Sequence, residues 1–234
     1  MKKTVCFLVS LWMGAISVSA QSSYHYDVNN DGVVNITDVI LIVNHILGKP
    51  EPPEAVDLEL PSGIKWASYN IGAAKPEDFG SYYAWGETEE KDEYTWNSYL
   101  HCDGSSSSCH DIGTNICNSQ YDVAHAKWGG KWRLPTSEEF QELLDNCTRE
   151  WTTLNGVNGR MFTSKTNGKS IFLPAAGDRW GTKEGSQGVY GYYWSGSLST
   201  YSSGNAYRLN FNSGTEYTGD NFRYRGFTVR PVTE

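Results

Sequence analysis

The chain has 234 residues, 20% of them charged and 38% hydrophobic, with a formal net charge of −8 at pH 7. This acidic balance argues against nucleic acid or an anionic membrane surface as a partner, because both attract basic patches. The length allows one sizeable domain with a small appendage.

Residues 1–20 have the pattern of a secretion signal. Lys2 and Lys3 precede a mostly apolar run, and a small-residue pattern ends at Ala20. The apolar run is too short, and too broken by Ser and Gly, to span a membrane. We therefore predict that the leader is cleaved, that there is no transmembrane segment, and that the protein is secreted, periplasmic or at the cell surface.

The stretch DVNNDGVVNITD, residues 27–38, spaces oxygen donors along a twelve-residue frame with Gly32 at position six. Calcium takes about six to eight oxygen ligands, and a glycine at position six permits the sharp turn of a calcium loop. An Asx-rich turn without metal is the alternative, but a turn needs fewer such residues. The sequence predicts a calcium site with ligands from Asp27, Asn29, Asp31, the Val33 carbonyl, Asn35 and Asp38.

Apolar residues then recur at helical spacing from Val39 to Leu47, and Gly48 follows as a stop signal. Residues 24–48 are thus predicted to form a calcium loop-helix module, and residues 49–55 a Pro-rich linker. A lone loop-helix cannot bury its own apolar side. It must pack on the main domain, on a copy of itself or on a partner.

The loop and helix resemble one repeat of a dockerin, with Ile36 and Thr37 at the positions where dockerins place partner-reading residues. The resemblance implies a cohesin as partner and an assembly that degrades polysaccharides. Dockerins ordinarily carry two repeats, whereas this chain shows one.

Residues 56–234 are rich in Gly, Trp, Tyr, Asn and Ser, a mixture typical of short strands and tight turns. One helix is predicted behind the capping box Thr136–Glu139, with Cys147 on its apolar face. Strands are predicted over 191–199, over 205–217 as a hairpin around Asn212–Gly214, and over 225–232.

Four cysteines follow the leader: Cys102, Cys109, Cys117 and Cys147. Four cysteines allow three pairings, and the sequence does not choose among them. The Ser-rich segment between Cys102 and Cys109 is flexible enough to close a local bridge, and the helix position of Cys147 favours a buried thiol. A zinc site with His101 and His110 is disfavoured, because the cysteine spacing matches no common zinc pattern.

Four segments resemble the Fibrobacter succinogenes major paralogous domain: VDLELPSGIKWASYNIGAAKPEDFGSYYAWGET, AHAKWGGKWRLPTSEEFQELL, SIFLPAAGDRW and RGFTVRPV. The similarity spans residues 56–232. That family is similar to C-type-lectin-like and sulfatase-modifying-factor folds. The resemblance implies an α+β, C-type-lectin-like domain of short twisted strands with one or two helices, preceded by the calcium loop-helix.

The sequence carries only weak catalytic motifs. It therefore disfavours enzymatic activity without deciding the question. No cysteine follows Cys147, and the sugar-binding triplets of calcium-dependent lectins do not occur. The acidic groups at 87–90 and 138–139 are better explained as a solvated turn and a helix start. Rings on adaptable loops make good ligand contacts, and the candidates here are Trp180, Tyr190 and Tyr201.

These patterns predict a secreted, non-catalytic binding or adhesion protein that binds calcium and recognises a glycan or a protein. The alternative is a component or accessory subunit of a polysaccharide-degrading assembly of the dockerin–cohesin type.

Overall fold

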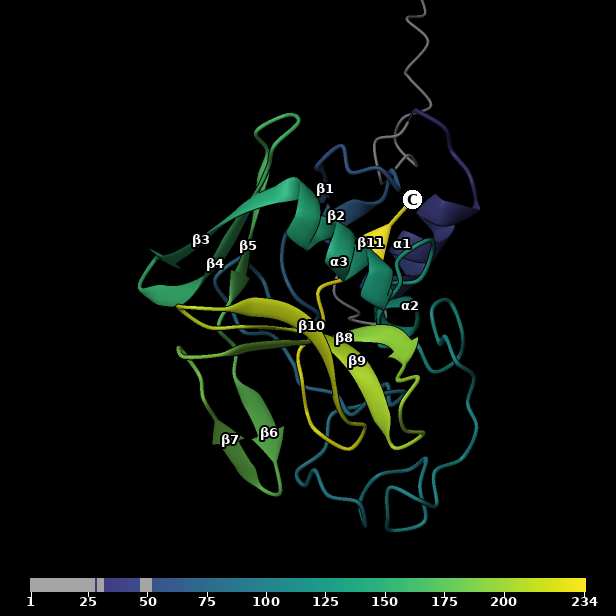
Figure 1. The fold of residues 1–234 in the computed structure, drawn as a ribbon. Coiled ribbons are helices and arrows are strands. Elements are labelled where there is room, and N and C mark those ends of the chain that lie inside the picture. Colours follow the sequence, from purple (N-terminus) through teal and green to yellow (C-terminus); the bar gives the residue numbers. More distant parts are fainter. Residues whose placement is uncertain (1–27, 29–31, 47–51) are drawn as a thin grey trace, which may run out of the picture. The chain divides into compact units, whose positions relative to one another are not determined.

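The computed structural model describes residue 28, residues 32–46 and residues 52–234 (Figure 1). The predicted leader and part of the predicted calcium loop, including Asp27, Asn29 and Asp31, lie outside the described residues. The chain divides into two compact units, residues 1–43 and residues 44–234. No helix in the described part of the chain has the length and apolar character needed to cross a membrane.

The N-terminal helix is α1 (Ile36–Ile46), as the apolar spacing predicts. The second unit is mostly β-structure with two short helices, α2 (Val123–Trp128) and α3 (Ser137–Asn146). Its strands are β1 (Ala55–Asp57), β2 (Lys65–Ala67), β3 (Cys147–Leu154), β4 (Val157–Ser164), β5 (Ser170–Pro174), β6 (Asp178–Trp180), β7 (Lys183–Gly185), β8 (Gly191–Leu198), β9 (Asn205–Phe211), β10 (Glu216–Phe222) and β11 (Val232–Thr233).

These strands form small antiparallel sheets in the orders β1-β2-β11, β3-β4-β5, β6-β7 and β10-β9-β8. The first sheet joins the beginning and the end of the domain, because Trp66 on β2 lies opposite both Val56 and Val232. Helix α3 contacts β3 and the three strands β8, β9 and β10 (Figure 1).

The α3 helix begins at the predicted capping box. The Thr136 side chain accepts from the Glu139 backbone, and the Glu139 carboxylate accepts from the Thr136 backbone. Phe140, Leu143 and Leu144 are buried on its inner side, and Cys147 follows them into the core as a buried thiol. The sequence-based predictions for this helix and for Cys147 are confirmed.

The hairpin between β9 and β10 is confirmed, with Asn212 at its turn. Its Oδ1 accepts hydrogen bonds from the backbone N–H groups of Gly214 at 2.8 Å and Thr215 at 3.0 Å. This is the Asx-turn geometry that favours asparagine at such positions.

The predicted continuous strand over 225–232 is wrong, because only Val232–Thr233 forms a regular strand there. Phe227 and Thr228 make isolated bridges to Tyr83 and Tyr193 instead, which belong to different parts of the domain. A segment that changes partner every few residues cannot sustain one ladder, even though its sequence alternates.

Buried tyrosine hydroxyls hold the loops of the domain together. Tyr82 donates to the Ala176 carbonyl, Tyr94 to Tyr82 and Tyr193 to Pro174, each at 2.6 Å. Burial raises the pKa of Tyr82 and that of Tyr94 to about 12. The folded chain therefore keeps these protons at a pH where the unfolded chain releases them.

We predict that the domain loses stability at alkaline pH. The contribution of Tyr82 and Tyr94 is fully present below pH 10, their ordinary pKa, and is lost as pH rises through about 12. Chemical denaturation at a series of pH values, with tyrosinate absorbance followed in parallel, measures the loss. An unfolding free energy that stays constant between pH 10 and pH 12 would contradict it.

Candidate functional site

The described part of the predicted calcium loop is closed by Asp38. This carboxylate is buried; its Oδ1 accepts from the Val28 N–H and its Oδ2 from the Asn35 N–H, both at 2.7 Å. Gly32 has φ +84°, the left-handed conformation that the turn at position six requires. The two ends of the loop are therefore held together by one side chain on the first turn of α1.

These residues fit a calcium ion. The Asp38 carboxylate faces the loop, since it accepts from the backbone N–H groups of Val28 and Asn35. Asn35 Nδ2 donates to the Val33 carbonyl at 3.2 Å, so two of the predicted calcium ligands lie next to each other. Oxygen donors of this kind suit a hard cation. When bound, calcium would supply the charge that draws carboxylates and carbonyls into one compact loop.

Helix α1 exposes apolar side chains along its length. The large hydrophobic side chains that are exposed on it are Ile36, Val39, Ile42, Val43 and Ile46, with Ile46 at 74%. Val39, Ile42, Val43 and Ile46 belong to the apolar series at helical spacing that the sequence analysis found, and a lone loop-helix cannot bury such a series by itself. An apolar stripe left in water is typical of a surface that a partner covers.

The second unit has a cavity of about 450 Å³ between two loops that meet through a backbone bridge. The Tyr94 N–H donates to the Gly181 carbonyl, and the Gly181 N–H to the Tyr94 carbonyl, each at 2.8 Å. We call it the Trp96–Trp180 cavity; its lining residues are Glu93, Tyr94, Thr95, Trp96, Trp180, Gly181, Thr182, Lys183 and Tyr224.

Aromatic rings make up one wall of the Trp96–Trp180 cavity. The Trp96 ring lies 4.8 Å from that of Tyr224 and 5.5 Å from that of Phe222, in edge-to-face arrangements. Phe222 is not itself a lining residue, but it stacks on Tyr224 at 5.8 Å and so supports this wall. A rigid apolar wall with one acidic and one basic residue, Glu93 and Lys183, among the lining residues is the composition of many small-ligand sites.

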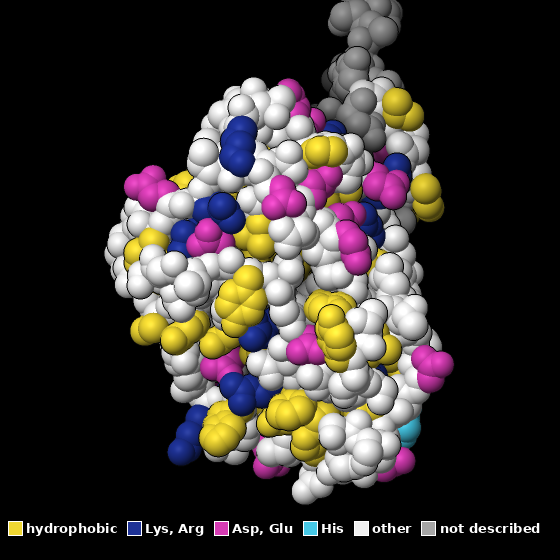
Figure 2. All heavy atoms as spheres, in the orientation of Figure 1, with side chains coloured by type: hydrophobic (Ala, Val, Ile, Leu, Met, Phe, Trp, Pro, Cys, Tyr) yellow, Lys and Arg dark blue, Asp and Glu magenta, His cyan; other side chains and the backbone are white. Residues whose placement is uncertain are grey.

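Trp180 is the exposed ring of this site, at 51%. The Arg225 guanidinium lies 5.6 Å from its ring centroid and also forms an ion pair with Asp178. This contact fixes the orientation of the indole and leaves part of it open to solvent. In Figure 2, hydrophobic and basic side chains gather over the β6–β7 hairpin, the part of the chain that carries Trp180.

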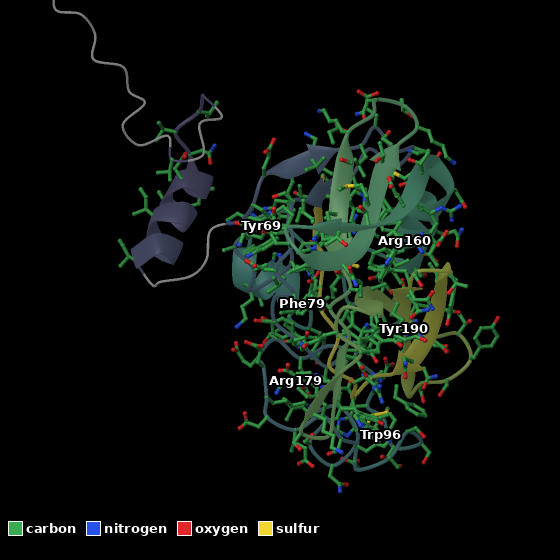
Figure 3. All side chains as sticks on the ribbon, turned by 90° about the vertical axis from the view of Figure 1, so that its left-hand side faces the viewer. Tyr69, Phe79, Trp96, Arg160, Arg179 and Tyr190 are labelled. Carbon is green, nitrogen blue, oxygen red and sulfur yellow. A yellow bond between two sulfur atoms is a disulfide. The ribbon has the colours of Figure 1, made fainter. Side chains whose placement is uncertain are left out.

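The structure does not bring the three predicted ligand residues into one pocket. Only Trp180 lines the cavity. Tyr190 stacks on Tyr192 at 5.7 Å beside β8, and Figure 3 places it well above Trp96. Tyr201 is 88% exposed on the loop between β8 and β9. Trp96, Phe222 and Tyr224 were missed by the sequence analysis, because no motif distinguishes them from core aromatics.

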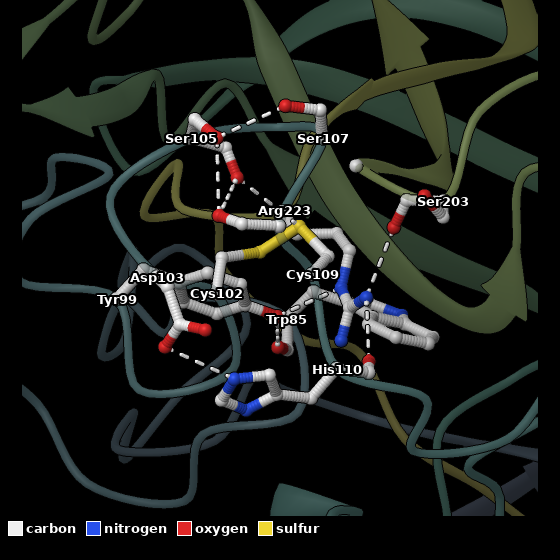
Figure 4. Close-up of a disulfide and its surroundings, with 12 residues drawn as sticks. Trp85, Tyr99, Cys102, Asp103, Ser105, Ser107, Cys109, His110, Ser203 and Arg223 are labelled. Carbon is white, nitrogen blue, oxygen red and sulfur yellow. Dashed lines mark hydrogen bonds and ion pairs between the residues drawn. A yellow bond between two sulfur atoms is a disulfide. The ribbon is translucent and has the colours of Figure 1, made fainter.

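A disulfide between Cys102 and Cys109 closes the Ser-rich loop near this wall (Figure 4). Arg223 donates to the Tyr99 hydroxyl at 2.8 Å, to the Ser203 carbonyl at 2.9 Å and to the His110 carbonyl at 3.4 Å. The Tyr99 ring in turn contacts Trp96. The sequence allowed this local bridge without choosing it among the three pairings, and the structure leaves Cys117 and Cys147 as free thiols.

The acidic residues considered for catalysis have structural partners. Lys91 Nζ lies 2.8 Å from Glu87, and Lys127 Nζ 2.8 Å from Glu89. Glu139 forms two hydrogen bonds with the Arg133 guanidinium. Within the described ranges, no three His, Cys, Asp or Glu side chains form a group that could hold a metal ion.

These features define a modular protein, with a small loop-helix followed by a mostly β domain that carries an aromatic cavity. The model of the Lcl C-terminal domain matches residues 77–233, and the chain belongs to this family. The model of the dockerin type I domain matches residues 25–60, so a dockerin precedes the Lcl C-terminal domain. No curated protein and no solved structure matches the chain.

The dockerin match confirms the resemblance of the loop and helix, and type I dockerins typically bind calcium. The match extends past α1 to residue 60, over the Pro-rich segment and β1. Since β1 pairs with β2 of the second unit, the described part of this extension, residues 52–60, is not a second loop-helix.

The disulfide generates a prediction for stability. Closing a loop with a sequence separation of 7 restricts the unfolded chain, so replacing both cysteines by Ser should lower the free energy of unfolding by about 2 kcal/mol. Denaturant titration of the Cys102→Ser/Cys109→Ser variant measures this change. The matched control is Cys117→Ser, which removes a free thiol; equal effects of the two variants would contradict the prediction.

Proposed function

We propose that the protein is a subunit of an extracellular assembly, held there by its dockerin module, and that its Lcl C-terminal domain is a non-catalytic saccharide-binding module. This favours the second of the two hypotheses from the sequence, a component of a dockerin–cohesin assembly. The observation that carries the proposal is the exposed apolar side of α1, which follows a loop closed by Asp38 within the dockerin match.

The dockerin half of the proposal supplies attachment. A cohesin would cover the apolar side of α1, and calcium, held by the six predicted ligands, would order the loop that precedes it. Because exposed apolar side chains are unfavourable in water, docking would also stabilise the module itself. Export is required for such an assembly, which agrees with the leader predicted over residues 1–20.

The Lcl C-terminal domain would supply recognition. Sugar rings present apolar C–H faces edged by hydroxyls, and the Trp96–Trp180 cavity offers ring walls together with the carboxylate of Glu93 and the ammonium of Lys183. A C-type-lectin-like arrangement remains the expectation for this domain on the resemblance stated above. A glycan is the ligand class that this lining supports best.

A secreted adhesion protein that acts alone is the second candidate function. It is favoured by the sequence, in which we find one loop-helix repeat where dockerins ordinarily carry two. A panel of cohesins immobilised with and without calcium separates the two candidates. Calcium-dependent capture of the full chain supports the assembly, and absence of capture by every cohesin supports the solitary protein.

Removal of the Asp38 carboxylate should uncouple calcium from the helix. We expect Asp38→Ala to weaken calcium binding at least about tenfold, because it deletes both a ligand and the clasp between Val28 and Asn35. Calorimetry with Ca²⁺ measures the affinity. Asp111→Ala, an exposed carboxylate in a turn of the second unit, is the control, and equal affinities in both variants would contradict the assignment.

Trp180 provides a test of the cavity. Trp180→Ala should lower the affinity for a bound oligosaccharide by about tenfold, since the indole is the exposed ring of the lining. The matched control is Tyr201→Ala, which removes a more exposed ring outside the cavity. A glycan array screened with the unchanged chain and with both variants measures the binding signal. Loss of signal in the Tyr201→Ala control alone would place the site outside the cavity.

A further inference from the structure

Phe222 is an exposed ring beside the Trp96–Trp180 cavity. It is the last residue of β10, it lies opposite Asn205 of β9, and 44% of it is exposed. Phe222 does not line the cavity, but its ring stacks on Tyr224 and lies 5.5 Å from Trp96, which both do. The aromatic wall therefore continues beyond the residues that line the cavity.

The backbone next to Phe222 is held from the inside of the domain. Arg223 is buried; its N–H donates to the Gly204 carbonyl at 2.9 Å, and its carbonyl accepts from the Trp85 N–H at 2.8 Å. Its guanidinium lies 4.7 Å from the Trp85 ring centroid. The Arg225 N–H donates to the Phe222 carbonyl at 3.1 Å and closes a turn. A ring on such a fixed support costs little ordering when a ligand binds.

An exposed ring alone is ordinary on a protein surface. Tyr217, on the same strand, is 49% exposed, and Tyr201 is more exposed still. Neither lines the cavity, and in the described part of the chain no ring contact joins either of them to Trp96 or Tyr224. Phe222 differs from both because its ring continues the wall of a cavity.

The cavity is small for a polysaccharide. Its volume of about 450 Å³ lies near the lower end of the roughly 300–1,000 Å³ that small-ligand sites occupy. A sugar chain that filled this volume would place its further units on the surface beside the cavity. The large rings exposed there are Trp180, which belongs to the lining, and Phe222, which does not.

The charges around the cavity favour a neutral ligand. Glu93 and Lys183 are the charged residues of the lining, one of each sign, so the lining has no net charge. Phe222 adds an apolar ring that has no hydrogen-bonding group. The whole chain has a formal net charge of −8, which disfavours a polyanion.

We propose that Phe222 forms an outer subsite of the Trp96–Trp180 cavity, so that the domain selects an extended neutral oligosaccharide over a disaccharide. One part of the sugar chain would fill the cavity, and a following sugar would lie with its apolar C–H face on the Phe222 ring. This inference rests on the proposed function, because it assigns the length and charge of the saccharide that the domain binds.

Calorimetry on the full chain tests the proposal, with disaccharides and hexasaccharides of glucan, xylan, mannan and chitin as probes. In at least one series the hexasaccharide should bind about fivefold more tightly than the disaccharide. Phe222→Ala should remove this gain and leave the disaccharide affinity unchanged, because the ring contacts only the outer sugar. Tyr217→Ala, which removes a similarly exposed ring of the same strand, should keep the gain.

Two further variants separate the flat ring from packing. Phe222→Tyr retains the ring and should retain the gain. Phe222→Leu retains apolar bulk against Tyr224 but lacks a ring face, so it should lose the gain even where Phe222→Ala folds poorly. Melting temperatures of all variants, and their capture by the cohesin panel, are measured alongside.

The outcomes separate this proposal from the one on which it rests. If no probe binds the unchanged chain, the saccharide-binding function is wrong and the subsite with it. If disaccharide and hexasaccharide bind equally, if Phe222→Ala weakens both equally, or if Phe222→Leu retains the gain, only the subsite is wrong. A preference for sulfated or uronate hexasaccharides over every neutral series, or a loss of cohesin capture in Phe222→Ala with unchanged sugar binding, would likewise overturn it.

Discussion

The two hydrogen bonds that Asp38 accepts from Val28 and Asn35 close the loop in front of α1, and the N-terminal module depends on this closure. A helix of 11 residues cannot remain well formed in water on propensity alone, and α1 exposes apolar side chains instead of burying them. The loop orders the first turn, calcium would reinforce the loop, and a partner would cover the rest. The proposed attachment would therefore bury apolar side chains that α1 leaves exposed.

Much of the second unit is irregular, so regular strand pairing alone does not hold it together. Its loops are tied by buried side chains that bond to backbone carbonyls. Arg230 is fully buried and donates to Asn70 Oδ1 at 2.8 Å, the Ala67 carbonyl at 3.2 Å and the Phe172 carbonyl at 2.9 Å. Arg223 does the same near the disulfide.

Local signals predicted the parts of the structure that local chemistry determines. The capping box at Thr136, the Asx turn at Asn212 and the apolar spacing of α1 each rest on residues a few positions apart, and each was correct. The segment over 225–232 was predicted wrongly, because its alternating pattern shows burial and not the number of strands it would meet.

The cavity lay beyond sequence reasoning for the same reason. Trp96 and Tyr224 are 128 positions apart, and their contact depends on where two loops meet. Trp180 was singled out because it lies in a Gly-rich loop, but Tyr190 lies in a similar context and stacks on β8 instead. Ring exposure depends on such long-range packing, whereas the calcium frame can be read from twelve consecutive residues.

Hydrogen–deuterium exchange over residues 36–46 tests the central claim most directly, measured on the full chain alone, with Ca²⁺, and with Ca²⁺ and a cohesin. If α1 is a docking helix, its amides gain some protection with Ca²⁺ and much more with the partner, and a chelator reverses both gains. Full protection in the free chain without calcium, or no further change on adding any cohesin, would contradict this account.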